Sequence, residues 1–342
     1  MSTPLRTSFC DLLGIDLPIV QAPIGSATNP ALAAAVSNAG GLGMLAGTWR
    51  DPDSLRRIVR ETRELTGRPF GVNLVLRWPP EERLELCLEE GVEVVSLAWG
   101  DPAPYIQRVH SGGARVLHTV GSAEEATAAA EAGVDVVVAQ GWEAGGHVVG
   151  SVATLPLVPR VVDAVHPRPV LAAGGIADGR GLAAALALGA AGVMMGTRFL
   201  ASEEARVHPG YRDAVLRASE TDTVYGRLFD IGWPDAPHRT LRNTTVAAWE
   251  EAGRPAAGSR PGEGEVVASG PDGSPVPRYS NVIPLPETTG SVEALALYMG
   301  QSAGLVTRVQ PAAEIVEDVR REAEEALQRL SGETRPREQP PG

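Results

Sequence analysis

The 342-residue sequence predicts an α/β fold, a (β/α)8 TIM barrel with a smaller inserted region of helices and loops. Eight short apolar runs alternate with alanine-rich helical stretches up to about residue 201, and continuous apolar runs are typical of parallel strands covered on both faces. A glycine-capped helix end followed by a buried strand recurs at 91–95, 131–136 and 188–193. Eight such units favour a closed barrel, with an open doubly wound sheet as the alternative.

Helix starts between the expected strands are marked by capping residues. Asn29 precedes a first-turn proline, and Asp51 and Ser122 are placed in the same way before helical stretches. The strands themselves are expected at 18–24, 42–47, 70–76, 94–100, 115–120, 134–141, 170–175 and 192–200.

The chain changes character after Ser202. Helical spacing is expected at 206–220, 243–251 and 291–304, and a long loop is expected in the Gly/Pro/Ser-rich stretch 253–280. An amphipathic helix at 315–330 could complete the barrel. We therefore expect a barrel of residues 1–205 and 291–330, a lid at 206–290 over the barrel mouth, and a disordered tail at 331–342.

Composition excludes several functions. The net charge of -12 without a basic block argues against nucleic acid, and no apolar stretch reaches the roughly 20 residues of a membrane helix. No signal peptide is visible, and Cys10 and Cys87 are far apart without metal-ligand spacing, so we expect free thiols, no metal site and a cytoplasmic location. Every basic side chain other than histidine is arginine, which excludes Schiff-base chemistry on a lysine.

One loop stands out as a candidate active site. The apolar run 134–138 is followed by Ala-Gln-Gly-Trp-Glu-Ala-Gly-Gly-His, ending at His147. The paired glycines Gly145 and Gly146 let the backbone approach a ligand closely, and an imidazole suits proton transfer near neutral pH. A loop-capping histidine is the alternative. Trp142 and Glu143 are interpreted as a lid contact and a loop brace.

Other strand ends supply groups that suit a phosphorylated heterocycle. In barrels of this kind a phosphate commonly binds after strands seven and eight, where Gly174-Gly175 and Gly196-Thr197 stand. Glycines used only for tight turns are the alternative. Backbone at 22–24 could lie along a ring edge, and the amides of Asn73 and Gln140 could bond to a heterocycle or satisfy loop backbone instead.

The motifs at 21–24, 71–73, 139–147, 173–176, 195–199 and 298–304 together resemble the nitronate monooxygenase family, formerly called 2-nitropropane dioxygenases. The Glu-Ala-Gly-Gly-His loop is the most discriminating of them. The resemblance implies bound FMN and oxidation of alkyl nitronates by O2 to a carbonyl compound and nitrite. Neutral nitroalkanes are a further candidate substrate.

Carried across residue by residue, the resemblance makes His147 the catalytic base or substrate-orienting group. If a nitroalkane is the substrate, a base must remove the proton next to the nitro group. The residues that would contact FMN are Ala22, Pro23, Ile24, Asn73, Gln140, Gly145, Gly146, Gly174, Gly175, Gly196, Thr197, Met299, Gly300 and Gln301.

Two other functions stay open. Flavin-dependent enoyl-acyl-carrier-protein reductases share the glycine-glycine-histidine loop and use NAD(P)H with an acyl thioester, and a flavin-binding homologue without turnover is the second. An IMP dehydrogenase-type reaction is excluded, because neither cysteine stands in a suitable barrel loop. A homodimer is left open.

The remaining histidines and the lid aromatics are assigned structural roles. His118 on the fifth strand is expected to be packed or hydrogen-bonded, and His238 is expected at the surface with His110, His166 and His208. The three aromatic residues Tyr225, Trp233 and Tyr298 are interpreted as lid core, with a role in shaping the substrate pocket as the alternative.

Overall fold

The computed structural model describes residues 5–332, in which eight parallel strands form one sheet that curls into a barrel. The sheet order is β1-β9-β8-β6-β5-β4-β3-β2, and a parallel bridge between Val20 and Leu42 joins its two ends. The (β/α)8 barrel is confirmed and the open sheet is wrong. The barrel strands are β1 (Ile19–Gln21), β2 (Gly43–Ala46), β3 (Phe70–Val75), β4 (Val94–Ala98), β5 (Arg115–Val120), β6 (Val136–Gln140), β8 (Val170–Ala173) and β9 (Gly192–Met195).

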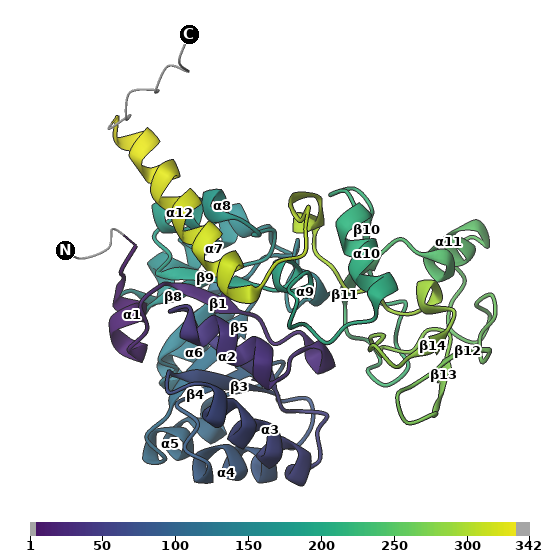
Figure 1. Ribbon diagram of the computed structural model, residues 1–342, viewed down its shortest axis with the longest axis horizontal. Coiled ribbons are helices and arrows are strands. Elements are labelled where there is room, and N and C mark those ends of the chain that lie inside the picture. The colour runs from purple at the N-terminus through teal and green to yellow at the C-terminus, as the bar shows by residue number, and fades with distance from the viewer. Residues whose placement is uncertain (1–4, 333–342) are drawn as a thin grey trace.

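Eight helices surround the barrel, and the last one comes from the end of the described chain (Figure 1). Asn29, Asp51, Ser122 and Asp178 each accept a hydrogen bond from a first-turn backbone N–H, which satisfies a donor that the helix itself cannot. The helices are α2 (Pro30–Asn38), α3 (Pro52–Leu65), α4 (Glu81–Glu89), α5 (Ala103–Ser111), α6 (Ala123–Ala132), α7 (Thr154–Val165), α8 (Gly179–Ala187) and α12 (Ala312–Ser331).

A short helix, α1 (Ser8–Leu13), closes the amino end of the barrel. Its Phe9 and Cys10 pack in one buried cluster with interior strand residues such as Met44 and Leu117. The opposite faces of the strands form the larger core beneath the helices. Because the interior is filled from the amino end, space for a ligand remains at the carboxyl ends of the strands.

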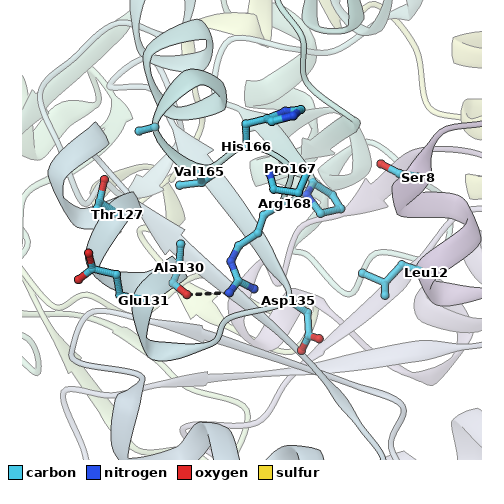
Figure 2. Close-up of a pocket in the computed structure, with 12 residues that line it drawn as sticks. Ser8, Leu12, Thr127, Ala130, Glu131, Asp135, Val165, His166, Pro167 and Arg168 are labelled. Atoms are coloured by element: carbon cyan, nitrogen blue, oxygen red, sulfur yellow. Dashed lines mark hydrogen bonds between the residues drawn. The ribbon is translucent and has the colours of Figure 1, made fainter.

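A groove of about 770 Å³ crosses the amino end of the barrel (Figure 2). Two of its charged groups satisfy backbone at element ends: the Arg168 guanidinium donates to the carbonyl of Ala130 (2.8 Å), and the Asp135 carboxylate accepts from the Val116 N–H (2.8 Å). These groups therefore serve the scaffold. Within residues 5–332, no helix is both long and apolar enough to cross a bilayer.

Residues 206–290 gather on one side of the barrel (Figure 1) and contain two small antiparallel sheets besides helices. The long loop expected at 253–280 is wrong in part, because a tight turn at Gly270–Gly273 lets the chain fold back as a hairpin. The elements are α10 (Pro209–Arg217), β10 (Thr223–Gly226), β11 (His238–Leu241), α11 (Thr244–Glu251), β12 (Val266–Ser269), β13 (Pro275–Pro277) and β14 (Thr289–Gly290), with β7 (Gly146–His147) joining β11. The division into barrel and lid stays a prediction.

Three other expectations need correction. The eighth strand ends at Met195 rather than at 200, because the chain turns at Gly196 into the short helix α9 (Thr197–Leu200). The helix expected at 291–304 is absent from the described chain, which there forms two 3-10 turns, η2 (Val292–Ala294) and η3 (Gln301–Leu305), with the segment between them lying along β11. A third such turn is η1 (Gly25–Ala27). Helix α12 includes Ser331, and residues 333–342 of the expected tail lie outside the described residues.

Candidate active site

A cavity of about 440 Å³ lies at the carboxyl ends of the barrel strands, within the usual size range of small-molecule sites. It is bounded by strand ends on one side and by residues of the 206–290 region on the other. Twelve of the residues predicted from sequence line it: Ala22, Pro23, Ile24, Asn73, Gln140, Gly145, Gly146, His147, Gly174, Gly175, Gly196 and Thr197.

Met299, Gly300 and Gln301 lie behind the His147 loop instead of lining the cavity. The Gly300 N–H donates to the Thr197 hydroxyl (2.9 Å), and the Gln301 N–H donates to the Glu143 carbonyl (3.0 Å). Gly145 packs so closely on this segment that a Cβ there would stand 2.5 Å from the Gly300 nitrogen. The C-terminal segment therefore supports the loop from its rear.

The loop is also clamped by two side chains. Arg239 on β11 donates from Nε (3.2 Å) and Nη2 (2.9 Å) to the Trp142 carbonyl, and its guanidinium lies 4.8 Å from the centre of the Trp142 ring. The Glu143 carboxylate accepts from the Thr154 N–H (2.9 Å) and hydroxyl (2.9 Å) at the start of α7. The interpretation of Glu143 as a loop brace is confirmed, and the loop is fixed from several sides.

His147 is a neutral imidazole with an unused nitrogen. Its ring stacks on Trp233 with centroids 4.0 Å apart, and its buried Nε2 has no hydrogen-bond partner in the described structure. Burial, with a smaller effect from His238, lowers the pKa of His147 to about 3. A buried polar atom without a partner costs free energy, so it points to a ligand that completes the bond.

The neighbouring His238 is buried at 2 % exposure, so its expected surface position is wrong. Its Nδ1 donates to the Ala236 carbonyl (3.0 Å), since Nε2 accepts from the Phe229 N–H (3.2 Å). Burial lowers the pKa of His238 to about 4. Both ring nitrogens are committed, so His238 is a rigid wall 5.5 Å from the His147 ring and has no free nitrogen for chemistry.

His118 lies outside the cavity. Leu117 belongs to the barrel interior and Thr119 lines the cavity, so strand alternation turns the intervening His118 outward toward the helices. It is buried, as expected, and burial lowers its pKa to about 4.

The two strand-end amides differ in what they bind. Gln140 uses both ends of its amide on the loop, donating to the His147 carbonyl (3.2 Å) and accepting from the Val149 N–H (2.8 Å). Asn73 commits its nitrogen to the Ser96 carbonyl (3.2 Å) on the neighbouring strand β4. Gln140 therefore shapes the loop that carries His147.

The glycines at the ends of β8 and β7 are required by their backbone. Gly146 (φ 73°), Gly174 (φ 98°) and Gly175 (φ 71°) are left-handed, a conformation that other residues adopt only with strain. No residue lining the cavity, among those described, carries a carboxylate or a guanidinium. Arg198 faces away and donates to the Arg308 carbonyl (3.3 Å). An anionic group in the cavity would be held by backbone N–H groups and hydroxyls.

Four aromatic residues lie on the cavity wall. Trp49 and Trp99 were not assigned to it from the sequence, whereas for Trp233 and Tyr298 the alternative, a pocket-shaping position, is the one found. The available signal was position: Trp49 follows the second expected strand by two residues and Trp99 lies near the end of the fourth, at the end of the barrel where ligands bind.

The comparisons with known proteins agree with this geometry. A family model described as nitronate monooxygenase matches residues 6–82 and 78–322. The chain belongs to this family.

Individual relatives fall into more than one activity. This chain is 33 % identical to a nitronate monooxygenase of Paraburkholderia phytofirmans, over 95 % of this chain and 97 % of the relative. It is 42 % identical to a (3aS,4S,5R,7aS)-5-hydroxy-7a-methyl-1-oxo-octahydro-1H-indene-4-carboxyl-CoA dehydrogenase of Rhodococcus jostii, over 74 % of this chain and 70 % of the relative. The structure of FabK from Thermotoga maritima matches with a TM-score of 0.82 and 38 % identity, over 96 % of this chain and 99 % of the FabK chain. The chain is thus an oxidoreductase of nitronate monooxygenase type.

Proposed function

We propose that the protein binds FMN in this cavity and oxidises alkyl nitronates with dioxygen. Two nitronate anions and one O2 give two carbonyl compounds and two nitrite ions, which balances atoms and charge. Family membership supports the reaction. The observation that carries the site assignment is His147, whose buried Nε2 lacks a partner in the described structure and whose ring lines the cavity.

The residues present fit FMN. Gly174 and Gly175 have conformations that bring backbone close to a ligand, and Gly196 and Thr197 line the same end of the barrel, where a phosphate is commonly held. The apolar residues 22–24 and the amide of Asn73 line the same cavity, which suits a flat heterocycle with polar edges. When bound, FMN supplies electron transfer between the nitronate and dioxygen.

His147 orients the substrate in this proposal. A nitronate has already lost its proton, so the site needs hydrogen-bond donors for the nitro oxygens more than a strong base. The neutral imidazole can donate one N–H, and the Gly145 and Gly146 backbone lies beside it. A base with a pKa of about 3 removes a carbon-bound proton poorly, so preformed nitronates are expected to react much faster than neutral nitroalkanes.

The test starts from the absorption spectrum of the purified protein. Oxidised-flavin bands that ethylnitronate bleaches without oxygen, with nitrite formed once air is admitted, are the expected result. His147→Ala should keep the flavin bands and lose on the order of 10² in kcat, the usual effect of removing one oriented donor. His166→Ala, at an exposed histidine, is the control and should match the wild type. A colourless protein that refuses FMN contradicts the proposal.

A second candidate is reduction of an enoyl thioester by NAD(P)H, favoured by the relative named as a carboxyl-CoA dehydrogenase at 42 % identity. It is tested in parallel with NADH and crotonyl-CoA. Bleaching by NADH and turnover of the thioester, without reaction of ethylnitronate, would replace the nitronate proposal. A yellow protein that responds to neither is a flavin-binding homologue without turnover.

A further inference from the structure

Four of the six tryptophans gather at one side of the cavity. Trp233, from the 206–290 region, stands at the centre of this group, and its ring lies 4.9 Å from Trp78, 5.1 Å from Trp99 and 5.9 Å from Trp49, centroid to centroid. The other three each come from the loop after a barrel strand, β2, β3 and β4 in turn. We call these four residues the indole wall.

The indole wall is partly open to the cavity. Trp49, Trp99 and Trp233 line the cavity, and Trp49 is 51 % exposed at its rim. Aliphatic side chains such as Val282 and Ile283 continue the same lining. Because no described lining residue carries a formal charge opposite to a carboxylate or an ammonium, a charged substrate tail would lose its hydration here without compensation.

The backbone at Trp99 is strained to place its ring. Its φ of 63° lies in the left-handed region, which is rare for a bulky residue and persists where the surrounding structure enforces it. In this conformation the indole reaches Trp233 and meets the His147 ring edge-on at 6.3 Å. The wall therefore stands directly beside the imidazole that the proposed reaction uses.

We propose that the indole wall selects substrates whose group next to the reacting carbon is flat, apolar and uncharged, of the size of an aromatic ring. Indole faces and edges attract another ring beyond simple area burial. The inference deepens the proposed function, on which it rests, because it names the substrate class of the same cavity.

The turnover test compares nitronates that differ only beyond the nitro group. The ratio of kcat/KM for the phenylnitromethane nitronate to that for the nitroethane nitronate is expected to fall about threefold to tenfold in Trp49→Ala. It should not change in Leu65→Ala, an equally exposed (52 %) apolar side chain on α3 outside the cavity. The wild type should prefer the 3-methyl-1-nitrobutane nitronate to the isosteric 3-nitropropionate nitronate by about tenfold or more. An unchanged kcat/KM ratio in Trp49→Ala overturns the inference, and so do equal kcat/KM values of the wild type for the uncharged and the carboxylate-bearing nitronate.

A binding test separates this inference from the reaction itself. Nitrobenzene and 4-nitrobenzoate share the nitro group and the ring, and neither has a hydrogen on the carbon that bears the nitro group, so neither forms a nitronate. Calorimetric titration of the purified protein should show nitrobenzene binding about tenfold tighter or more, with the preference reduced in Trp49→Ala. This pattern without nitronate turnover supports the indole wall while refuting the proposed function. Equal affinities refute the indole wall whatever the turnover.

Discussion

Acidification from pH 7 to pH 5 should destabilise the protein through three histidines, His118, His147 and His238, whose pKa values are lowered in the fold. Burial lowers the pKa of His118 to about 4, of His147 to about 3 and of His238 to about 4, whereas an unfolded chain has histidine pKa values near 6.5. Between about pH 4 and pH 6.5 the unfolded chain therefore binds more protons than the folded one. Stability is complete above about pH 6.5 and is lost as the pH falls below it.

The size of the effect follows from those shifts. At pH 5 each histidine is about 1.5 pH units below its unfolded pKa, which corresponds to about 2 kcal/mol of lost stability per group at about 1.4 kcal/mol per unit. Three groups together cost about 6 kcal/mol, an order-of-magnitude figure comparable with the whole stability of many domains. Carboxylates such as Asp318, whose pKa hydrogen bonds lower to about 2, lose their contribution only at lower pH.

The assay is urea unfolding at pH 7 and pH 5, comparing the drop in the free energy of unfolding between the two pH values within each variant. In His238→Gln the drop should shrink by about 2 kcal/mol, even if that variant is less stable at both pH values. His166→Gln, at an exposed position, should retain the wild-type drop. A wild type equally stable at both pH values, or a His238→Gln variant with the full drop, refutes the reasoning.

Two further predictions concern the loop that carries His147. Arg239→Met leaves the Trp142 carbonyl without its donors. We expect the free energy of unfolding, measured by thermal denaturation, to fall by about 1–3 kcal/mol, and kcat to fall with flavin content retained. An unchanged kcat would show that the clamp does not position the loop. Gly145→Ala drives a Cβ to 2.5 Å from the Gly300 nitrogen, whereas at Gly146 a Cβ meets open space and the cost is the positive φ alone, about 1–2 kcal/mol. Chemical denaturation should rank Gly145→Ala as the less stable variant, and the reverse order would contradict the packing argument.

The barrel could be predicted because its signals are local. Buried parallel strands are continuous apolar runs, and helix starts carry capping side chains such as Asn29 and Asp51, so the positions of all eight strands follow from short windows of sequence. Parallel strands bring their carboxyl ends to one edge, which placed twelve of the expected site residues around one cavity.

The features that could not be predicted depend on contacts between segments far apart in the chain. His238 stands among polar and proline-bearing neighbours, yet pairing of β11 with β7 buries it against His147. The apolar spacing at 291–304 reads as helical because the segment is buried, while its backbone lies along β11. Arg239 and Trp233 act through partners about 90 residues away in the chain, which no local pattern reports.

The way the His147 loop is held bears on when the protein becomes competent during synthesis. The loop is synthesised before residue 150, but β11, the 299–301 segment and the closing helix α12 all follow it in the chain. A nascent or truncated chain that ends near residue 200 could assemble barrel strands while the imidazole stayed unanchored. Because these supporting pieces are made last, the loop that carries His147 is anchored only when the chain is nearly complete.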